Sequence, residues 1–239
     1  MQLTSFMPVK LITGPGCVRS AAKELGKLGT KALIVTGKNA ARACGALQDV
    51  IDALEESRQG WILFDGIGQN PALTDCMDAA KEANAAGADF VIGIGGGSAL
   101  DAAKCIAVLA ANPGMTQQQL YAFDWPKAPL NIAVVGTTAG TGSEVTKVSV
   151  ITTPEGRKKS FHHEAIFPRL ALGDPTYTMT LPPLLQLPRW SMCLLTARRA
   201  SSAAQPIICR RAMPWKGSGC CFRFSGCWKK RDSRISATM

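Results

Sequence analysis

Short apolar runs alternate with longer segments of helical composition between residues 31 and 135 of this 239-residue chain. Four runs of five or six residues have the composition of buried strands: Lys31–Thr36, Trp61–Asp65, Asp89–Ile94 and Asn131–Val135. Between them lie three segments of helical composition: Ala40–Glu56, Ala72–Ala86 and Ser98–Ala111. Strands that alternate with helices of this length form βαβ units. The pattern therefore predicts an α/β fold, a Rossmann-like parallel sheet with helices on both faces.

The pattern loosens beyond about Thr146. Residues 148–153 (VSVITT) are strand-like, residues 154–159 (PEGRKK) form a charged turn, and Arg169–Leu172 is again strand-like. The stretch contains no internal repeat and no low-complexity segment. We therefore expect residues 1–183 to form one α/β domain.

The formal net charge of +10 is confined to the end of the chain. Residues 184–239 hold 11 of the 27 Lys and Arg residues and a single acid, whereas residues 1–183 hold 16 basic and 16 acidic residues. The same segment holds five of the nine Cys and three of the five Trp. Arg pairs, prolines and glycines interrupt any regular period there. We predict no fold for this basic tail, residues 184–239.

Composition also bears on the class of protein. No run approaches 18 consecutive apolar residues, which argues against a membrane-spanning helix. The start MQLTSFMPVK lacks a charged region followed by an apolar stretch, so we expect no secretory signal and a cytoplasmic location. The basic tail leaves nucleic-acid binding open as an alternative, because cations with interleaved Trp can contact phosphates and stack on bases. It has no C-x-x-C pair and no His, so a zinc knuckle is not expected.

The strongest local motif is a glycine loop directly after the expected strand Asp89–Ile94. Three consecutive glycines, Gly95, Gly96 and Gly97, precede a helical segment that opens at Ser98. Glycines let the backbone approach a bulky anion, and the N–H groups of a first helical turn point at it. Ser98 can cap that helix. The motif predicts phosphate binding, with a tight βα turn that needs glycine only for its shape as the alternative.

A second polar loop, GTTAGTGSEVT at residues 136–146, follows the expected strand Asn131–Val135. It combines three glycines with six hydroxyl or carboxyl side chains. Ligands of open α/β sheets bind at the carboxyl edge, where this loop would lie. The alternative is a loop whose hydroxyls only bond one another.

Together the two loops resemble the iron-containing (group III) alcohol dehydrogenase family. GGGSALDAAK followed some 40 residues later by GTTAGTGSEVT carries the resemblance, with further matches at GPG (14–16), KALIVTGK (31–38), QNP (69–71) and DP…LPP (174–183). The resemblance covers residues 1–183. It implies an α/β domain that binds NAD or NADP, a C-terminal helical domain that supplies an iron(II) site, and interconversion of an alcohol with its aldehyde or ketone. Members are often homo-oligomers.

The resemblance also implies cofactor contacts. Gly95, Gly96, Gly97 and Ser98 would cradle the pyrophosphate, and Asp101, one turn into the helix, would face the same cleft. The other implied contacts are hydrogen bonds to the nucleotide from Thr137, Thr138 and Thr141, a loop over the cofactor at Asn70, packing by Val150, and an approach to the nicotinamide by Lys159.

The position after strand KALIVT bears on the choice of cofactor. NAD-preferring members often carry an Asp there, which accepts hydrogen bonds from the ribose. This chain has Gly37, followed by Lys38. Without the carboxylate there is no repulsion against a 2′-phosphate, so we expect NADP to be tolerated as well as NAD.

The metal site is where the chain departs from the family. That site needs one Asp and three His, beginning with a G-M-D-A-L-T-H-A-type helix just after LPP, and its metal polarises the alcohol oxygen. This chain has two histidines, His162 and His163, and both precede that point. Adjacent residues point in different directions, so we expect a solvent-facing pair. We assign no metal ligand and no catalytic residue.

A frameshift near Pro183 would explain the basic tail. Read in a shifted frame with free wobble bases, Ser191–Thr196 permits Asp-Val-Leu-Thr-His, and Met213–Phe222 permits Ala-Met-Glu-Gly-Ile-Arg-Leu-Leu-Phe. The first segment contains an Asp and a His at the family's ligand spacing. Our hypothesis is that an out-of-frame peptide replaces the helical domain and leaves a catalytically incomplete fragment.

Several functions remain open at this point. A glycerol-dehydrogenase-like polyol oxidoreductase and a dehydroquinate-synthase-like lyase share the architecture, although GTTAGTGSE favours the iron-containing alcohol dehydrogenases. The alternatives outside enzymes are a nucleotide-binding remnant and a basic nucleic-acid-binding protein.

Overall fold

The computed structural model describes residues 6–138 and 140–180. Six strands form one parallel sheet in the order β1-β8-β5-β4-β2-β3. Their bounds are β1 (Lys10–Thr13), β2 (Lys31–Thr36), β3 (Gly60–Phe64), β4 (Phe90–Gly95), β5 (Asn131–Gly136) and β8 (Leu170–Gly173). Every residue of β4 is buried, as expected for a central strand covered on both faces.

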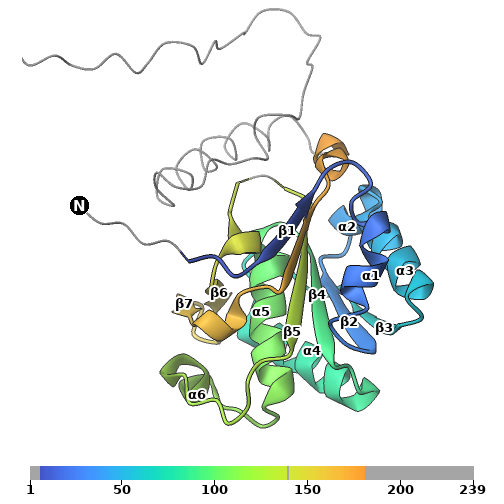
Figure 1. Ribbon diagram of the computed structural model, residues 1–239. Coiled ribbons are helices and arrows are strands. Elements are labelled where there is room, and N and C mark those ends of the chain that lie inside the picture. Colours follow the sequence, from blue (N-terminus) through green and yellow to red (C-terminus); the bar gives the residue numbers. More distant parts are fainter. Residues whose placement is uncertain (1–5, 139, 181–239) are drawn as a thin grey trace, which may run out of the picture.

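Helices cover both faces of the sheet (Figure 1). One apolar core lies under α1 (Ala22–Leu25), α2 (Ala40–Ala43) and α3 (Ala46–Glu56). The other lies under α4 (Leu73–Ala86) and α5 (Gly97–Ala111). The predicted α/β fold with a parallel sheet and helices on both faces is therefore confirmed.

The chain reverses its direction across the sheet between β2 and β4. From β2 it moves outwards through α2 and α3 to the edge strand β3. It then returns through α4 on the opposite face and enters β4 on the other side of β2. The neighbouring strands β2 and β4 are therefore followed by helices on opposite faces of the sheet, α2 and α5. Such an arrangement opens a crevice at the carboxyl edge of the sheet. The glycine loop lies at this crevice.

A separate antiparallel pair, β6 (Val148–Thr152) and β7 (Lys158–His162), packs against α5. Ile151 and Phe161 anchor the pair, because both are buried in the core on the α5 side of the sheet. The expected strand at residues 148–153 is thus present. The expected turn PEGRKK is shorter than predicted, because its two lysines belong to β7.

Some elements differ from the expectation. The segment Ala40–Glu56 is broken into α2 and α3, since Gly45 adopts a left-handed backbone with φ of 84°. The strand expected at Trp61–Asp65 is β3, which lies at the sheet edge and is only partly buried. Strand β1 and the short helix α6 (Gln117–Ala122) were not expected. A capping box between Thr116 and Gln119 begins α6.

The described residues end before the predicted domain boundary. Pro183 and the basic tail, residues 184–239, lie outside them. Among the helices of the described part, none is long and apolar enough to cross a membrane.

Candidate functional site

The floor of the candidate site is the turn from β4 into α5. Gly95 has a φ of +148°, and a Cβ on it would lie 2.9 Å from the Cβ of Ala99. Helix α5 begins at Gly97, and no described side chain caps it. The first N–H groups of a helix have no intrahelical acceptor, and the helix dipole makes this end favourable for negative charge. The floor therefore has the geometry of an anion site on a helix N-terminus.

The threonine-rich loop after β5 forms one wall and touches this floor. Thr137 N–H donates to the Gly95 carbonyl at 3.0 Å. A Cβ on Gly96 would lie 3.1 Å from Thr138 Oγ1, and one on Gly97 would lie 2.8 Å from Thr141 Cγ2. Because Gly96 and Gly97 have no side chains, the threonine side chains of the wall can pack directly on the backbone of the floor.

The opposite wall is the loop between β3 and α4, which is tied to the end of β6. Thr152 N–H donates to the Pro71 carbonyl at 2.8 Å, and Thr152 Oγ1 donates to the Asn70 carbonyl at 3.2 Å. Asn70 has a left-handed backbone with φ of 57°. Its N–H donates to Ser98 Oγ at 3.4 Å, which links the wall to the floor.

These walls enclose a cleft of about 790 Å³ at the carboxyl edge of the sheet. Eleven of the twelve sequence-predicted cofactor residues line it: Gly37, Asn70, Gly95, Gly96, Gly97, Ser98, Asp101, Thr137, Thr138, Thr141 and Val150. Sequence reasoning missed other lining residues, among them Thr36, Ile67, Gln69, Ser143, Thr152 and Lys158.

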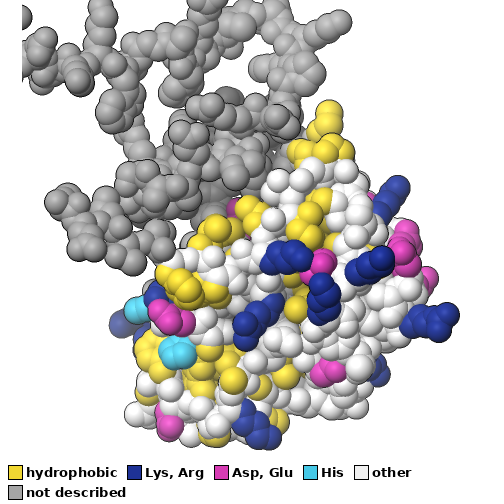
Figure 2. Space-filling view, in the orientation of Figure 1, with side chains coloured by type: hydrophobic (Ala, Val, Ile, Leu, Met, Phe, Trp, Pro, Cys, Tyr) yellow, Lys and Arg dark blue, Asp and Glu magenta, His cyan; other side chains and the backbone are white. Residues whose placement is uncertain are grey.

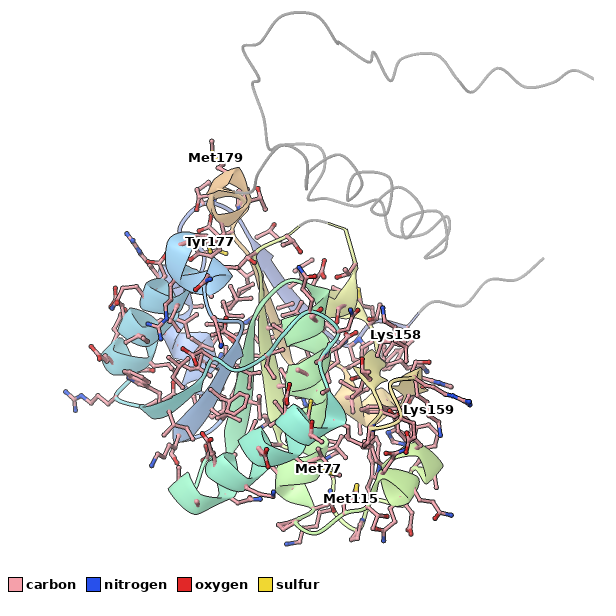
Figure 3. The ribbon with its side chains drawn as sticks, turned by 180° about the vertical axis from the view of Figure 1, so that it is seen from behind. Met77, Met115, Lys158, Lys159, Tyr177 and Met179 are labelled. Carbon is pink, nitrogen blue, oxygen red and sulfur yellow. The ribbon has the colours of Figure 1, made fainter. Side chains whose placement is uncertain are left out.

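The twelfth residue, Lys159, lies outside the cleft, and its neighbour Lys158 lies in it. Side chains alternate along a strand, so Lys159 shares a face of β7 with the buried Phe161. Its ammonium stands 4.1 Å from the ring centroid of Tyr121 on α6. The lysine at the cleft is therefore Lys158 rather than Lys159, and Figure 3 labels both. The buried Phe161 two residues later was the signal that could have told them apart.

Ser98 does not cap α5, contrary to the expectation. The helix begins one residue earlier, so Ser98 stands inside the first turn and Gly96 takes the cap position. Its hydroxyl accepts the Asn70 N–H instead.

Asp101 lines the cleft, but both its carboxylate oxygens are engaged within the protein. Ser143 Oγ donates to Oδ1 at 2.6 Å, and Val150 N–H donates to Oδ2 at 3.1 Å. Burial raises the Asp101 pKa, although the nearby Lys104 ammonium and the Ser143 hydrogen bond oppose that effect. Burial likewise raises the pKa of Glu144. Sequence reasoning did not single out Lys104 or Ser143.

Known proteins are similar to this domain in sequence and fold. The family model for iron-containing alcohol dehydrogenase matches residues 8–175. The chain belongs to the iron-containing alcohol dehydrogenase family.

Curated relatives in this family include aldehyde reductases. Sulfoacetaldehyde reductase of Bilophila wadsworthia is 34% identical over 185 residues, which cover 77% of this chain and 48% of the relative. Lactaldehyde reductase of Escherichia coli is 34% identical over 181 residues, covering 72% of this chain and 46% of the relative. The chain spans about half the length of the curated relatives it matches.

Solved structures agree with the sequence relatives. The iron-containing alcohol dehydrogenase of Thermotoga maritima superposes with a TM-score of 0.74 at 35% identity, covering 78% of this chain and 51% of that one. This domain is thus similar in fold to about half of an iron-containing alcohol dehydrogenase.

The described residues do not fit the iron that the family name implies. Residues 6–138 and 140–180 contain no group of three or more His, Cys, Asp or Glu side chains that could hold a metal ion. His162 and His163 are exposed at the end of β7, and Figure 2 shows histidine side chains at the surface. The ring of His163 packs 4.9 Å from that of Trp125, and its Nδ1 accepts the Ala165 N–H.

Proposed function

We propose that the cleft binds a nicotinamide dinucleotide, NAD or NADP. The observation that carries this proposal is the open N-terminus of α5 behind three glycines, two of which have no room for a side chain. The cleft of about 790 Å³ is within the size range of cofactor pockets, on the order of 300–1,000 Å³. The pyrophosphate would lie on the backbone N–H groups of Gly97 and Ser98.

The cleft's own side chains would hold the rest of the nucleotide. The hydroxyls of Thr137, Thr138 and Thr141 offer hydrogen bonds from one wall, and the Asn70 amide offers them from the other. Val150 presents an apolar surface, with 38% of it exposed, against which a ring can pack. When bound, the cofactor supplies a hydride acceptor or donor.

Two further roles follow from the geometry. The Lys158 ammonium would approach the cofactor from β7 in place of Lys159. Gly37 lines the cleft where a ribose carboxylate partner would stand, so both NAD and NADP fit the charge at this position.

We further propose that this domain is the cofactor half of an NAD(P)-linked oxidoreductase of alcohols and aldehydes. Its relatives act on such small molecules, as their names state. Residues 1–239 contain two histidines, fewer than the family's three-histidine site needs. We therefore propose that residues 1–239 bind the nucleotide without turning it over.

To test nucleotide binding, the full chain is titrated with NADH and with NADPH, and the fluorescence of the nucleotide reports binding. We expect saturable binding that persists at physiological salt. Salt screens attraction to the exposed charges of the basic tail, whereas the glycine-loop site also binds through backbone hydrogen bonds. Absence of binding for both nucleotides would contradict the proposal.

The same preparation tests turnover. Simple alcohols with NAD or NADP are added with and without ferrous iron, and the nicotinamide absorbance is followed. We expect no reduced nucleotide. Turnover that depends on iron would show a complete enzyme and contradict the proposed loss of activity.

A further inference from the structure

Lys104 is a lysine whose side chain is entirely buried, one turn along α5 from Asp101. Nearly all lysines are exposed, and a buried one is held by specific partners. Its ammonium has three N–H donors, and three acceptors surround it. These are the Ser143 carbonyl at 2.7 Å, the Ser143 hydroxyl at 2.9 Å and the Val148 carbonyl at 2.8 Å.

These acceptors belong to two segments that are separate from α5 in the sequence. Ser143 begins the 3₁₀ turn Ser143–Val145 at the end of the threonine-rich loop. Val148 begins β6. One ammonium thus joins the helix behind the glycine loop to one wall of the cleft and to the hairpin β6–β7.

Asp101 completes this connection from the same helix face. Its carboxylate accepts from the Ser143 hydroxyl and the Val150 N–H, and its backbone carbonyl accepts from Ser149 Oγ at 2.8 Å. The Lys104 Nζ and Asp101 Oδ1 atoms are 3.9 Å apart. The two charges therefore balance each other while both hold β6.

The other end of β6 is bonded to the second wall of the cleft, the loop between β3 and α4. Thr152 holds the loop at Asn70 and Pro71 by two hydrogen bonds. Since β6 is fixed at its start by α5 and holds that loop at its end, the position of both walls depends on the contacts of Lys104.

We infer that Lys104, with Asp101 and Ser143, is a positioning residue that sets the separation of the two cleft walls. This inference rests on the proposed nucleotide binding. Asp101 and Ser143 line the cleft, whereas Lys104 does not, and its ammonium donates to three protein acceptors. Its effect reaches the ligand through the threonine-rich loop and β6.

The test compares Lys104→Met with Val108→Ala in the full chain. The first variant keeps an unbranched side chain but removes the three donors. The second removes buried methyl groups from the next turn of the same helix, away from the loop. For each, we measure the melting temperature, the dissociation constant of NADPH, and amide hydrogen exchange over residues 140–152.

We expect Lys104→Met to raise the NADPH dissociation constant at least about tenfold, and to speed exchange over residues 140–152. Val108→Ala should lower the melting temperature without either change. Equal effects of the two variants on binding and on local exchange would show a merely structural role and overturn the inference. If Lys104→Met does not fold, Ser143→Ala decides by hydrogen exchange over residues 140–152 in the nucleotide-free protein, because it removes one acceptor of Lys104 and one donor to Asp101 but also lines the cleft.

The exchange measurement separates this inference from the proposed function. If the unaltered chain binds neither nucleotide, the proposed function fails. Comparing hydrogen exchange over residues 140–152 in the nucleotide-free unaltered chain and in Lys104→Met then still shows whether Lys104 holds the turn Ser143–Val145 and strand β6. Unchanged exchange in Lys104→Met would overturn the inference whatever the nucleotide result.

Discussion

Gly97 is a floor residue of the cleft at which the threonine-rich loop leaves no room for a side chain. A Cβ there would lie 2.8 Å from Thr141 Cγ2, so an alanine has to push the threonine-rich loop away. We expect Gly97→Ala to weaken NADPH binding at least about tenfold, because the added methyl group displaces a wall of the cleft and a loss of about 1.4 kcal/mol in binding free energy is tenfold in the dissociation constant. The measurement is the dissociation constant by fluorescence titration.

Gly26→Ala is the matched control for Gly97→Ala. A Cβ at Gly26 meets its nearest atom at 3.4 Å, and the residue lies at the end of α1, outside the cleft. Its affinity should equal that of the unaltered chain. Unchanged affinity in Gly97→Ala would mean that the nucleotide binds elsewhere.

Lys104 also predicts a pH dependence of stability. Burial lowers its pKa to about 8 from an ordinary 10.5, against the attraction of Asp101 on α5 and Glu144 on the facing turn. Between these two values the unfolded chain binds more protons than the folded one, so the free energy of unfolding rises with pH. Relative to Lys104→Met, we expect a rise of up to about 3 kcal/mol from pH 8 to 10.5.

Urea denaturation of both proteins across this pH range measures the difference. The other titrating groups are common to the two chains and cancel to first order. A difference that stays flat or falls with pH would contradict the lowered pKa of Lys104 in the folded chain.

At the scale of elements, we propose that Gly37, directly after β2, governs the choice of nucleotide. Gly37 lines the cleft, and a Cβ on it would lie 3.1 Å from the Ile67 carbonyl, so a small adjustment admits a side chain. Gly37→Asp places a carboxylate where a 2′-phosphate would lie, and like charges in contact cost several kcal/mol. We expect the ratio of NADPH to NADH dissociation constants to rise at least about tenfold.

The control for charge is Gly37→Asn, which has nearly the same size. It should leave the ratio close to that of the unaltered chain. An equal change in Gly37→Asn and Gly37→Asp would show that size, and not charge, acts at this position.

The elements that could be predicted are those with a strong apolar run or a long helical segment. Strand β4 and helix α5 flank the glycine loop; the strand is a strong apolar run, and the helix is a long helical segment. The break at Gly45 was missed because one glycine inside a helical pattern does not show whether its φ is positive. The four-residue β1 at the sheet edge is too short for a period to appear.

The site divides in the same way. Glycines that let another loop pack against their backbone, such as Gly96 and Gly97, form a local pattern and could be placed from the sequence. Lys104 and Ser143 are 39 positions apart, and only the packing of β6 on α5 brings them together. Such a pair gives no local signal, so the positioning contacts could not be predicted.

At the scale of the whole molecule, the charge is divided unevenly along the chain. The acids and bases of residues 1–183 balance, whereas the basic tail, outside the described residues, carries the net +10. We continue to propose a shifted reading frame near Pro183 as the cause. Sequencing the coding DNA tests this: restoring the frame there should open a long reading frame with further His codons, and a frame closed by early stop codons would contradict it.

The central claim is that the cleft between β2, β4 and the threonine-rich loop binds a nicotinamide dinucleotide. Hydrogen–deuterium exchange of the full chain with and without saturating NADPH tests it most directly, because it locates the ligand. We predict protection in residues 67–71, 94–104 and 136–150, which contain most of the residues that line the cleft. Protection confined to residues 184–239, or no protection at all, would contradict the account.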